Sequence, residues 1–400
     1  MKAKTSQGET SDKSNKRNLF SSPFMLELLR VTIAILIALG IGFIITLLVS
    51  EEPIKAYTAF LIGPLTKLNR VGDWLEEAIT LTFLGLAVAV VFKANQFSLG
   101  QEGQMVLGAL VAGSIALFVP LPGYLRIPLA ILASMVVGFL WGLLPGYLKA
   151  YLNANEIVST LMLNSIAILI YEWLLTYYIK PPTAGYTSSA TFTPEGSMPS
   201  FIPKLPFLSD LRTLFSNQTN ISIAVYLVII AVIVVYYLMY RTPFGYELRM
   251  IGANPKFARY GGINVKKTVM LAFAISGIFA GLAGSHLAMG IHHKLILNIS
   301  VGLGFEGIVV SLLANNNPLG IPFAALAYGY LRAGANVMER SSDMSREMVL
   351  VIQGIIILLV TAERLMPILR RWIAARRNGG PAASAQTTAT ETNGLPGGGD

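Results

Sequence analysis

Cysteine is absent from the 400-residue sequence, and charged residues are scarce. The lack of cysteine excludes a small scaffold held together by disulfides. Charged residues make up 13% of the chain, whereas soluble domains carry about 25%. This leaves too little polar surface to cover a water-soluble globule, so a soluble enzyme is excluded. Hydrophobic residues make up 54% of the chain, which excludes a disordered regulator.

The hydrophobic residues form long blocks, which indicate a membrane protein. Residues 31–50 hold no charge over 20 positions. A helix of that length rises about 1.5 Å per residue and spans the roughly 30 Å hydrocarbon layer. A cleaved signal peptide is the alternative, but its apolar part is usually shorter, whereas this block runs directly into Glu51 and Glu52. We expect a retained first span.

Further apolar blocks predict further spans. These must be helical, because lipid offers backbone polar groups no other partner and the sequence lacks the alternation of a barrel. The blocks are residues 78–92, 105–119, 127–148, 157–179, 221–240, 268–292, 304–331 and 348–362.

The basic residues set the orientation of these spans. The loop 241–267 holds six Lys or Arg residues against a single acid, Glu247, and both ends of the chain are basic. The positive-inside rule places this loop and both termini in the cytoplasm. The net charge of +9 is explained by membrane topology and gives no reason to expect nucleic acid as a partner.

Six spans before the loop satisfy this orientation, and an even number must follow it. Residues 304–331 are therefore expected to cross twice, around Asn315-Asn316-Asn317-Pro318. The sequence predicts an all-α polytopic membrane protein with about ten transmembrane helices over residues 30–377.

Four segments are expected to lie outside the bilayer. Residues 1–29 form a basic cytoplasmic tail. Residues 51–77, with more acids than bases, and 179–220, rich in Pro, Ser and Thr, are external. Residues 378–400 are of low complexity and are expected to be disordered.

Two short stretches resemble each other and indicate an inverted internal repeat. Gly100-Gln101-Glu102-Gly103 and Gly304-Phe305-Glu306-Gly307 each precede an apolar helix and follow the second span of a five-span half. The first is expected towards the cytoplasm and the second towards the outside, as in transporters whose halves are related by an axis in the membrane plane.

The two carboxylates of these motifs have two compatible interpretations. A carboxylate at mid-bilayer costs about 2.5–3.5 kcal/mol, so Glu102 and Glu306 should not face lipid. They border the route of a polar solute, or they lie at helix N-termini, where the helix dipole favours an anion.

The fifth span offers a similar choice. Asn155 is placed to cap its start, with Glu156 in the first turn. Thr160 and Asn164 lie one helical turn apart, and either contact the solute or hold helices together by hydrogen bonds.

The basic loop has features that topology alone does not require. Pro243 and Gly245 are expected to end the sixth span, and Asn254 and Pro255 to start a short helix over residues 255–260. That helix would present basic side chains to a cytoplasmic partner. The alternative is that the basic residues only enforce orientation.

Several motifs together resemble one family. They are NQFSLGQEGQ at 95–104, NEIVSTLMLN at 155–164, the loop GYELR–GANP–ARYGGI at 245–263, FAISGIFAGLAG at 273–284, and GFEGI with NNPLG at 304–320. In this order they are similar to the bacterial ABC-importer permeases of the branched-chain amino acid/simple sugar family, in its nucleoside-type branch. The chain departs from the family pattern at Met250, Phe257 and Ser98-Leu99. The departure at Ser98-Leu99 bears on fine solute selectivity, not on the class of protein.

The resemblance implies a membrane-spanning subunit in the bacterial plasma membrane, with nucleosides as the first choice of solute and simple sugars or branched-chain amino acids as alternatives. It implies two cytoplasmic ATPase subunits, a second permease subunit and an external or lipid-anchored solute-binding protein as partners. The sequence has no G-x-x-x-x-G-K-[ST] phosphate loop, so no cofactor is expected on this chain and a partner uses the ATP.

The site residues follow from the motifs. We expect the substrate pathway at Asn95, Phe97, Glu102, Gln104, Thr160, Asn164, Phe305 and Glu306. We expect contact with the ATPase at Arg249, Gly252, Asn254, Pro255, Lys256, Arg259, Gly261 and Gly262.

Two other classes of transport protein fit the same pattern. A secondary transporter driven by an ion gradient also fits the apolar blocks and the repeat, and a channel is a third possibility. The three histidines have no ligand partner at metal-binding spacing, so no metal is expected. Gly277, Gly281 and Gly284 form a stripe typical of close helix packing.

Overall fold

The computed structural model describes residues 37–355, apart from residues 38, 183, 202–220, 301 and 346. This part of the chain is helical and contains two isolated β-bridges but no strand. Residues 175–179 and 287–292 are π-helical and continue α6 and α11. The helices are Leu39–Val49, α2 (Pro53–Ile62), η2 (Gly63–Leu65), α3 (Leu68–Lys93), α4 (Gln101–Phe118), α5 (Gly123–Leu152), α6 (Glu156–Leu174), η3 (Leu175–Ile179), α8 (Ala224–Arg241), α9 (Pro243–Ala253), α10 (Pro255–Tyr260), α11 (Val265–His286), η5 (Leu287–His292), α12 (Leu303–Leu313), α13 (Ile321–Ser341) and residues 347–355.

Within the described residues, six helices are long and apolar enough to cross a membrane: α3, α4, α5, α6 with η3, α8, and α11 with η5. They fall in two groups. α3, α4 and α11 are 72–83% buried inside the bundle, whereas α5, α6 and α8 are only 22–33% buried. Apolar helices that are exposed in this way are suited to contact with lipid. The prediction of an all-α membrane protein is confirmed.

The glycine stripe of α11 forms the closest helix contacts. A side chain at Gly277 would meet the backbone of Gly138 on α5, and one at Gly284 would meet the backbone of Met105 on α4. The predicted role in close packing is confirmed, because only a residue without a side chain lets these backbones come so close together.

We expect Gly277→Val to prevent stable folding, because the added side chain cannot fit against the backbone of α5. The yield of monodisperse protein in detergent measures the effect. Gly40→Val is the matched control, since nothing lies within 4 Å of a Cβ built at Gly40. Equal yields of the two variants would contradict the prediction.

Residues 304–331 divide as the sequence predicts. α12 ends before the turn and α13 begins after it, with Asn315 and Asn316 in the left-handed conformation at φ 54° and 53°. α13 continues to Ser341, ten residues beyond the predicted block. The helix continues through the polar residues Arg332 and Asn336 because both side chains pair with other helices: Arg332 with Glu306, and Asn336 with Glu77.

The predicted external segment 51–77 is also largely helical. It holds α2, and α3 begins at Leu68 instead of near residue 78. Asp343, just after α13, accepts hydrogen bonds at 2.7 Å from the Ser50 hydroxyl and from the N–H of Glu51, which hold the pKa of Asp343 below its usual range. The end of the first helix therefore lies beside the end of α13.

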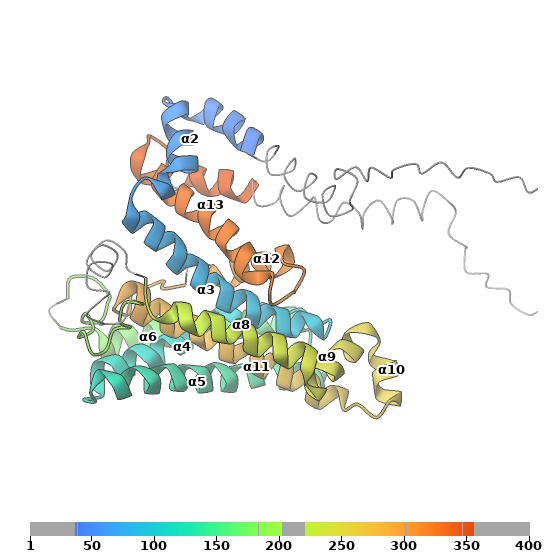
Figure 1. The fold of residues 1–400 in the computed structure, drawn as a ribbon. Helices are drawn as coiled ribbons and strands as arrows, with labels where there is room; N and C mark the ends of the chain where they lie inside the picture. The colour runs from blue at the N-terminus through green and yellow to red at the C-terminus, as the bar shows by residue number, and fades with distance from the viewer. Residues whose placement is uncertain are drawn as a thin grey trace, which may run out of the picture.

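Some predicted segments lie outside the described residues: the tails 1–29 and 378–400, residues 183 and 202–220 of the external loop, and residues 356–362 of the last block. Figure 1 shows α9 and α10 at one end of the long helices, and the segment around residues 184–201 at the other. The bundle therefore has two distinct ends.

Candidate functional site

The two Gly-x-Glu-Gly motifs meet inside the bundle. Glu102 lies in the first turn of α4, and its Oε1 accepts hydrogen bonds from the Ser300 hydroxyl at 2.8 Å and from the N–H of Gly302 at 2.9 Å. Gly302 is the residue that caps α12, and Gly304 packs directly against Glu102. The carboxylate of one motif thus stabilises the start of the helix that contains the other.

The two motifs are approached from opposite ends of the bundle. α3 ends at Lys93 beside α9, and the chain turns back there to reach α4. η5 ends at His292, and the segment after it pairs with Ser189 and Phe192 at the far end before α12 begins. The motifs therefore meet although their leading segments come from opposite ends, with Glu102 of the first beside Gly302 and Gly304 at the second.

Thr160 and Asn164 hold the first motif in place. Asn164 accepts a hydrogen bond from the N–H of Gly103 at 2.9 Å and donates one to the carbonyl of Leu99 at 2.5 Å. Thr160 accepts from the N–H of Leu99 at 3.3 Å. The sequence allowed two roles for Thr160 and Asn164: contact with the solute, or hydrogen bonds that hold helices together. The contacts seen here are of the second kind.

Asn155 caps α6 as predicted, accepting from the N–H groups of Ile157 and Val158. Asn95 and Phe97 lie exposed in the segment before α4, where Phe97 stacks on Phe92 with ring centroids 5.0 Å apart. Phe305 is also exposed.

Gln101 and Gln104 on α4 are buried, and their amide atoms have no hydrogen-bond partner among the described residues. A Cβ built at Gly142 on α5 would lie 3.1 Å from Nε2 of Gln104, so this amide faces α5. A buried polar group without a partner costs about 1–3 kcal/mol. The pair therefore reduces stability, which favours a role beyond packing.

Glu306 belongs to an ionic network that was not predicted from the sequence. Arg332 on α13 pairs with Glu306, and its Nε lies 3.6 Å from Oε1 of Glu77 on α3. Asn336 donates to the same Oε1 at 3.2 Å. An arginine in the apolar stretch of α13 was the available signal, since such residues are paired and functional in membrane segments.

His286 lies in a second buried network. Its Nε2 pairs with Glu76 and its Nδ1 lies 2.9 Å from the Thr80 hydroxyl. Glu76 also accepts a hydrogen bond from the N–H of Ser222. The carboxylate partner is 210 residues away in the chain, which is why spacing did not reveal it.

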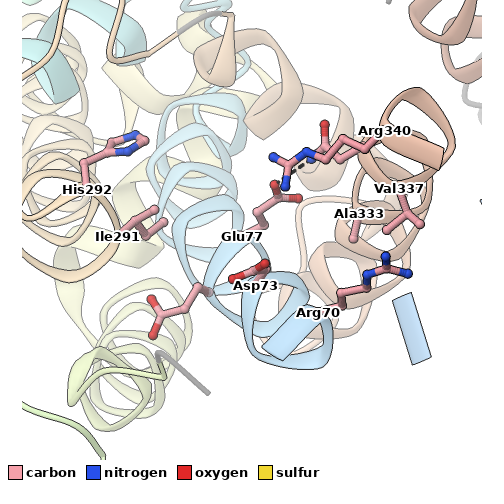
Figure 2. Close-up of a pocket in the computed structure, with 10 residues that line it drawn as sticks. Arg70, Asp73, Glu77, Ile291, His292, Ala333, Val337 and Arg340 are labelled. Atoms are coloured by element: carbon pink, nitrogen blue, oxygen red, sulfur yellow. Dashed lines mark hydrogen bonds between the residues drawn. The ribbon is translucent and has the colours of Figure 1, made fainter. Parts of the chain in front are cut away.

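A cavity of about 350 Å³ lies next to both networks, between α3, η5 and α13 (Figure 2). Its lining residues are Arg70, Asp73, Glu76, Glu77, Ile291, His292, Ala333, Asn336, Val337 and Arg340. A smaller cavity of about 120 Å³ adjoins Glu102, Tyr171, Glu172 and Ser300.

The helix predicted at residues 255–260 is confirmed as α10. Asn254 caps it, accepting from the N–H of Lys256 at 3.0 Å and of Phe257 at 3.1 Å, and Pro255 occupies its first turn. Ala258 is its one buried residue, whereas Tyr260 is 92% exposed. α10 therefore projects from the bundle (Figure 1).

The remaining loop residues shape this projection. Arg249 donates to the carbonyl of Met239 and holds α9 against α8, and Gly252 packs against the carbonyl of Lys93. Gly261 follows α10, and Gly262 has a φ of +80°. Gly245 was predicted to end the sixth span, but it lies inside α9, because Thr242 caps a new helix that starts at Pro243.

The sequence matches one family of known proteins. Residues 70–361 match the family described as "Branched-chain amino acid transport system / permease component". The chain belongs to this family. As a permease component of a transport system, it is a transporter subunit and not an enzyme. The match includes both Gly-x-Glu-Gly motifs, the larger cavity and α9–α10.

Three relatives cover most of this permease. The guanosine ABC transporter permease protein NupP of Bacillus subtilis is 30% identical over 82% of this chain and 92% of its own. The glucose ABC transporter permease protein TsgB13 of Haloferax volcanii is 28% identical over 89% and 92%. The nucleoside ABC transporter permease protein NupB of Lactococcus lactis is 28% identical over 84% and 91%. No solved structure matches the permease significantly.

We expect Glu102→Ala to destabilise this permease by about 1.5–3 kcal/mol, because Ser300 and Gly302 lose a charged hydrogen-bond acceptor. Thermal unfolding in detergent measures the loss. Glu172→Ala is the control, since it adjoins the same small cavity but makes no ion pair or side-chain hydrogen bond with the described residues. Similar shifts for both variants would argue against the contact described here.

Proposed function

We propose that this chain is the membrane-spanning subunit of an ATP-binding-cassette importer that carries nucleosides into the bacterial cell. The family match carries the proposal, together with relatives whose names specify guanosine and nucleoside ABC transporter permeases. Simple sugars or branched-chain amino acids are the alternative solutes, and the glucose permease relative supports the first of these.

We place about ten crossings in the bacterial plasma membrane, with both termini and α9–α10 in the cytoplasm. Each five-span half has a buried second helix, α3 and α11, that leads through a turn-back segment to a Gly-x-Glu-Gly motif. The approach of the two motifs from opposite ends supports an inverted repeat.

In this proposal the solute passes along the buried motifs. Glu102, Gln104, Glu306 and Phe305 border its route, while Thr160 and Asn164 hold the segment that carries Asn95 and Phe97. The unpaired amide of Gln104 supports a polar route, because a passing solute would supply the missing hydrogen bonds.

In this proposal α10 couples ATP hydrolysis in the partner subunit to movement of the solute. Lys256 and Arg259 are exposed on it beside Phe257 and Tyr260, which suits insertion into a groove of a cytoplasmic ATPase subunit. The position of this helix is set by the remaining loop residues: Arg249, Gly252, Asn254, Pro255, Gly261 and Gly262. The ATPase subunits, a second permease subunit and an external or lipid-anchored binding protein complete the importer, and this chain itself binds no ATP.

An ion-coupled secondary transporter is the competing function. Its proton or sodium site would be Glu102 or Glu306, yet both carboxylates have protein partners: Glu102 accepts two hydrogen bonds and Glu306 pairs with Arg332. These contacts favour the ATP-driven importer.

Uptake of radiolabelled guanosine into vesicles that contain the full importer tests the proposal. We expect uptake that requires ATP and the binding protein, is inhibited by vanadate and resists ionophores. Uptake that is independent of ATP and abolished by an ionophore would refute it. Parallel assays with glucose and leucine decide among the solutes.

A further inference from the structure

The larger cavity has polar groups that the surrounding protein leaves unpaired. Oε1 of Glu77 receives the hydrogen bond from Asn336 and faces Arg332, but its buried Oε2 has no hydrogen-bond partner among the described residues. Asp73 makes no ion pair or hydrogen bond with that part of the chain. Glu76 differs, because His286 and Ser222 occupy its oxygens.

The two carboxylates with unpaired oxygens lie on the same wall of the cavity. Asp73 and Glu77 are four residues apart on α3, so they share one face of this helix. Figure 2 shows both side chains directed from α3 into the space before α13. Two acceptors one helical turn apart match a ligand that carries neighbouring hydroxyl groups.

The rest of the lining suits the remainder of such a ligand. Ile291, Ala333 and Val337 supply apolar surface from η5 and α13, and Arg340 supplies donors without an ion pair to the described residues. The volume of about 350 Å³ falls within the range of cavities that hold small molecules.

We propose that this cavity binds the vicinal diol of a sugar ring, with the carboxylates of Asp73 and Glu77 accepting hydrogen bonds from the two hydroxyls. Hydrogen bonds to a carboxylate are about twice as strong as those between neutral groups. The inference deepens the proposed function, on which it rests, since nucleosides and glucose both carry such a diol.

The position of the cavity connects it to the expected route. Through Arg332, Glu77 is linked to Glu306 in the second Gly-x-Glu-Gly motif. A diol that binds Oε2 of Glu77 is therefore connected to the second motif through a single side chain, that of Arg332. The cavity lies near the end of α3 opposite Lys93, which is where an external solute would arrive in the proposed orientation.

Equilibrium binding of radiolabelled guanosine to the permease–ATPase complex in lipid nanodiscs, without the binding protein, tests the proposal. We expect guanosine to bind, 2′,3′-dideoxyguanosine to compete about tenfold less well or worse, and leucine not to compete. Competition by glucose shows whether the diol of a free sugar is sufficient or the base of a nucleoside is also needed.

Variants locate the site. Asp73→Asn and Glu77→Gln should each weaken guanosine binding about tenfold and remove the preference over the dideoxy compound. Glu339→Gln is the matched control, because it neutralises an acid on α13 next to Arg340 without changing the cavity lining. Asp73 is exposed, so its substitution should not disturb folding even if that of Glu77 does.

Three results would overturn the inference: no binding of guanosine, equal competition by leucine, or unchanged binding in both variants. Guanosine uptake by the wild-type importer distinguishes a wrong diol site from a wrong proposed function. ATP-driven guanosine uptake without binding at the cavity refutes the diol site alone. An importer that takes up no nucleoside refutes the proposed solute.

Discussion

Arg332→Ala is expected to lower the free energy of unfolding by about 3 kcal/mol. Arg332 lies between Glu77 and Glu306, so its loss leaves two largely buried carboxylates without a cation. Removing one partner of a buried ion pair costs about 3–5 kcal/mol. The side chains of Arg332, Glu77 and Glu306 are still 20–23% exposed to solvent, which favours the lower end of that range.

Thermal unfolding of the purified permease in detergent measures this effect. Arg340→Ala is the control, because it removes an arginine from the same helix that has no ion pair to the described residues. Adding Glu306→Gln to Arg332→Ala should recover part of the lost stability, since one of the uncompensated charges is removed. An Arg332→Ala variant as stable as wild type would show that the network contributes nothing.

The second large effect is expected at α10. Replacing both Phe257 and Tyr260 by Ala should reduce stimulation of the ATPase by the permease more than tenfold. Exposed aromatic side chains are typical hot spots of interfaces and contribute about 2 kcal/mol or more when a partner buries them. Both side chains are exposed, 62% and 92%, so the permease itself should fold normally.

ATP hydrolysis by the assembled complex, with and without solute-loaded binding protein, measures this coupling. Tyr237→Ala is the matched control, because this tyrosine is also exposed but belongs to α8 and to neither α9 nor α10. Normal stimulation in the double variant would contradict the role given to α10. A charge-reversing variant of Lys256 and Arg259 then separates the contribution of charge from that of the aromatic side chains.

Local signals predicted much of the fold. The apolar blocks located the long helices, the Asn-Pro pair located α10, and the Asn315–Asn317 run located the turn between α12 and α13. The glycine stripe of α11 predicted close packing. Each of these signals depends on neighbouring residues: a cap, a φ preference, or the cost of transferring one segment into lipid.

The sequence by itself determined that this chain is a helical membrane protein, and its motifs indicated the family. Only the tertiary structure decided which charged side chains share the interior: Glu77 with Arg332, and Glu76 with His286. Hydropathy treats Glu76, Glu77 and Arg332 as charges that end a span, so α3 and α13 were predicted too short. Their burial is tolerated because each charge finds its partner on a distant segment, and such a contact exists only once the helices have packed.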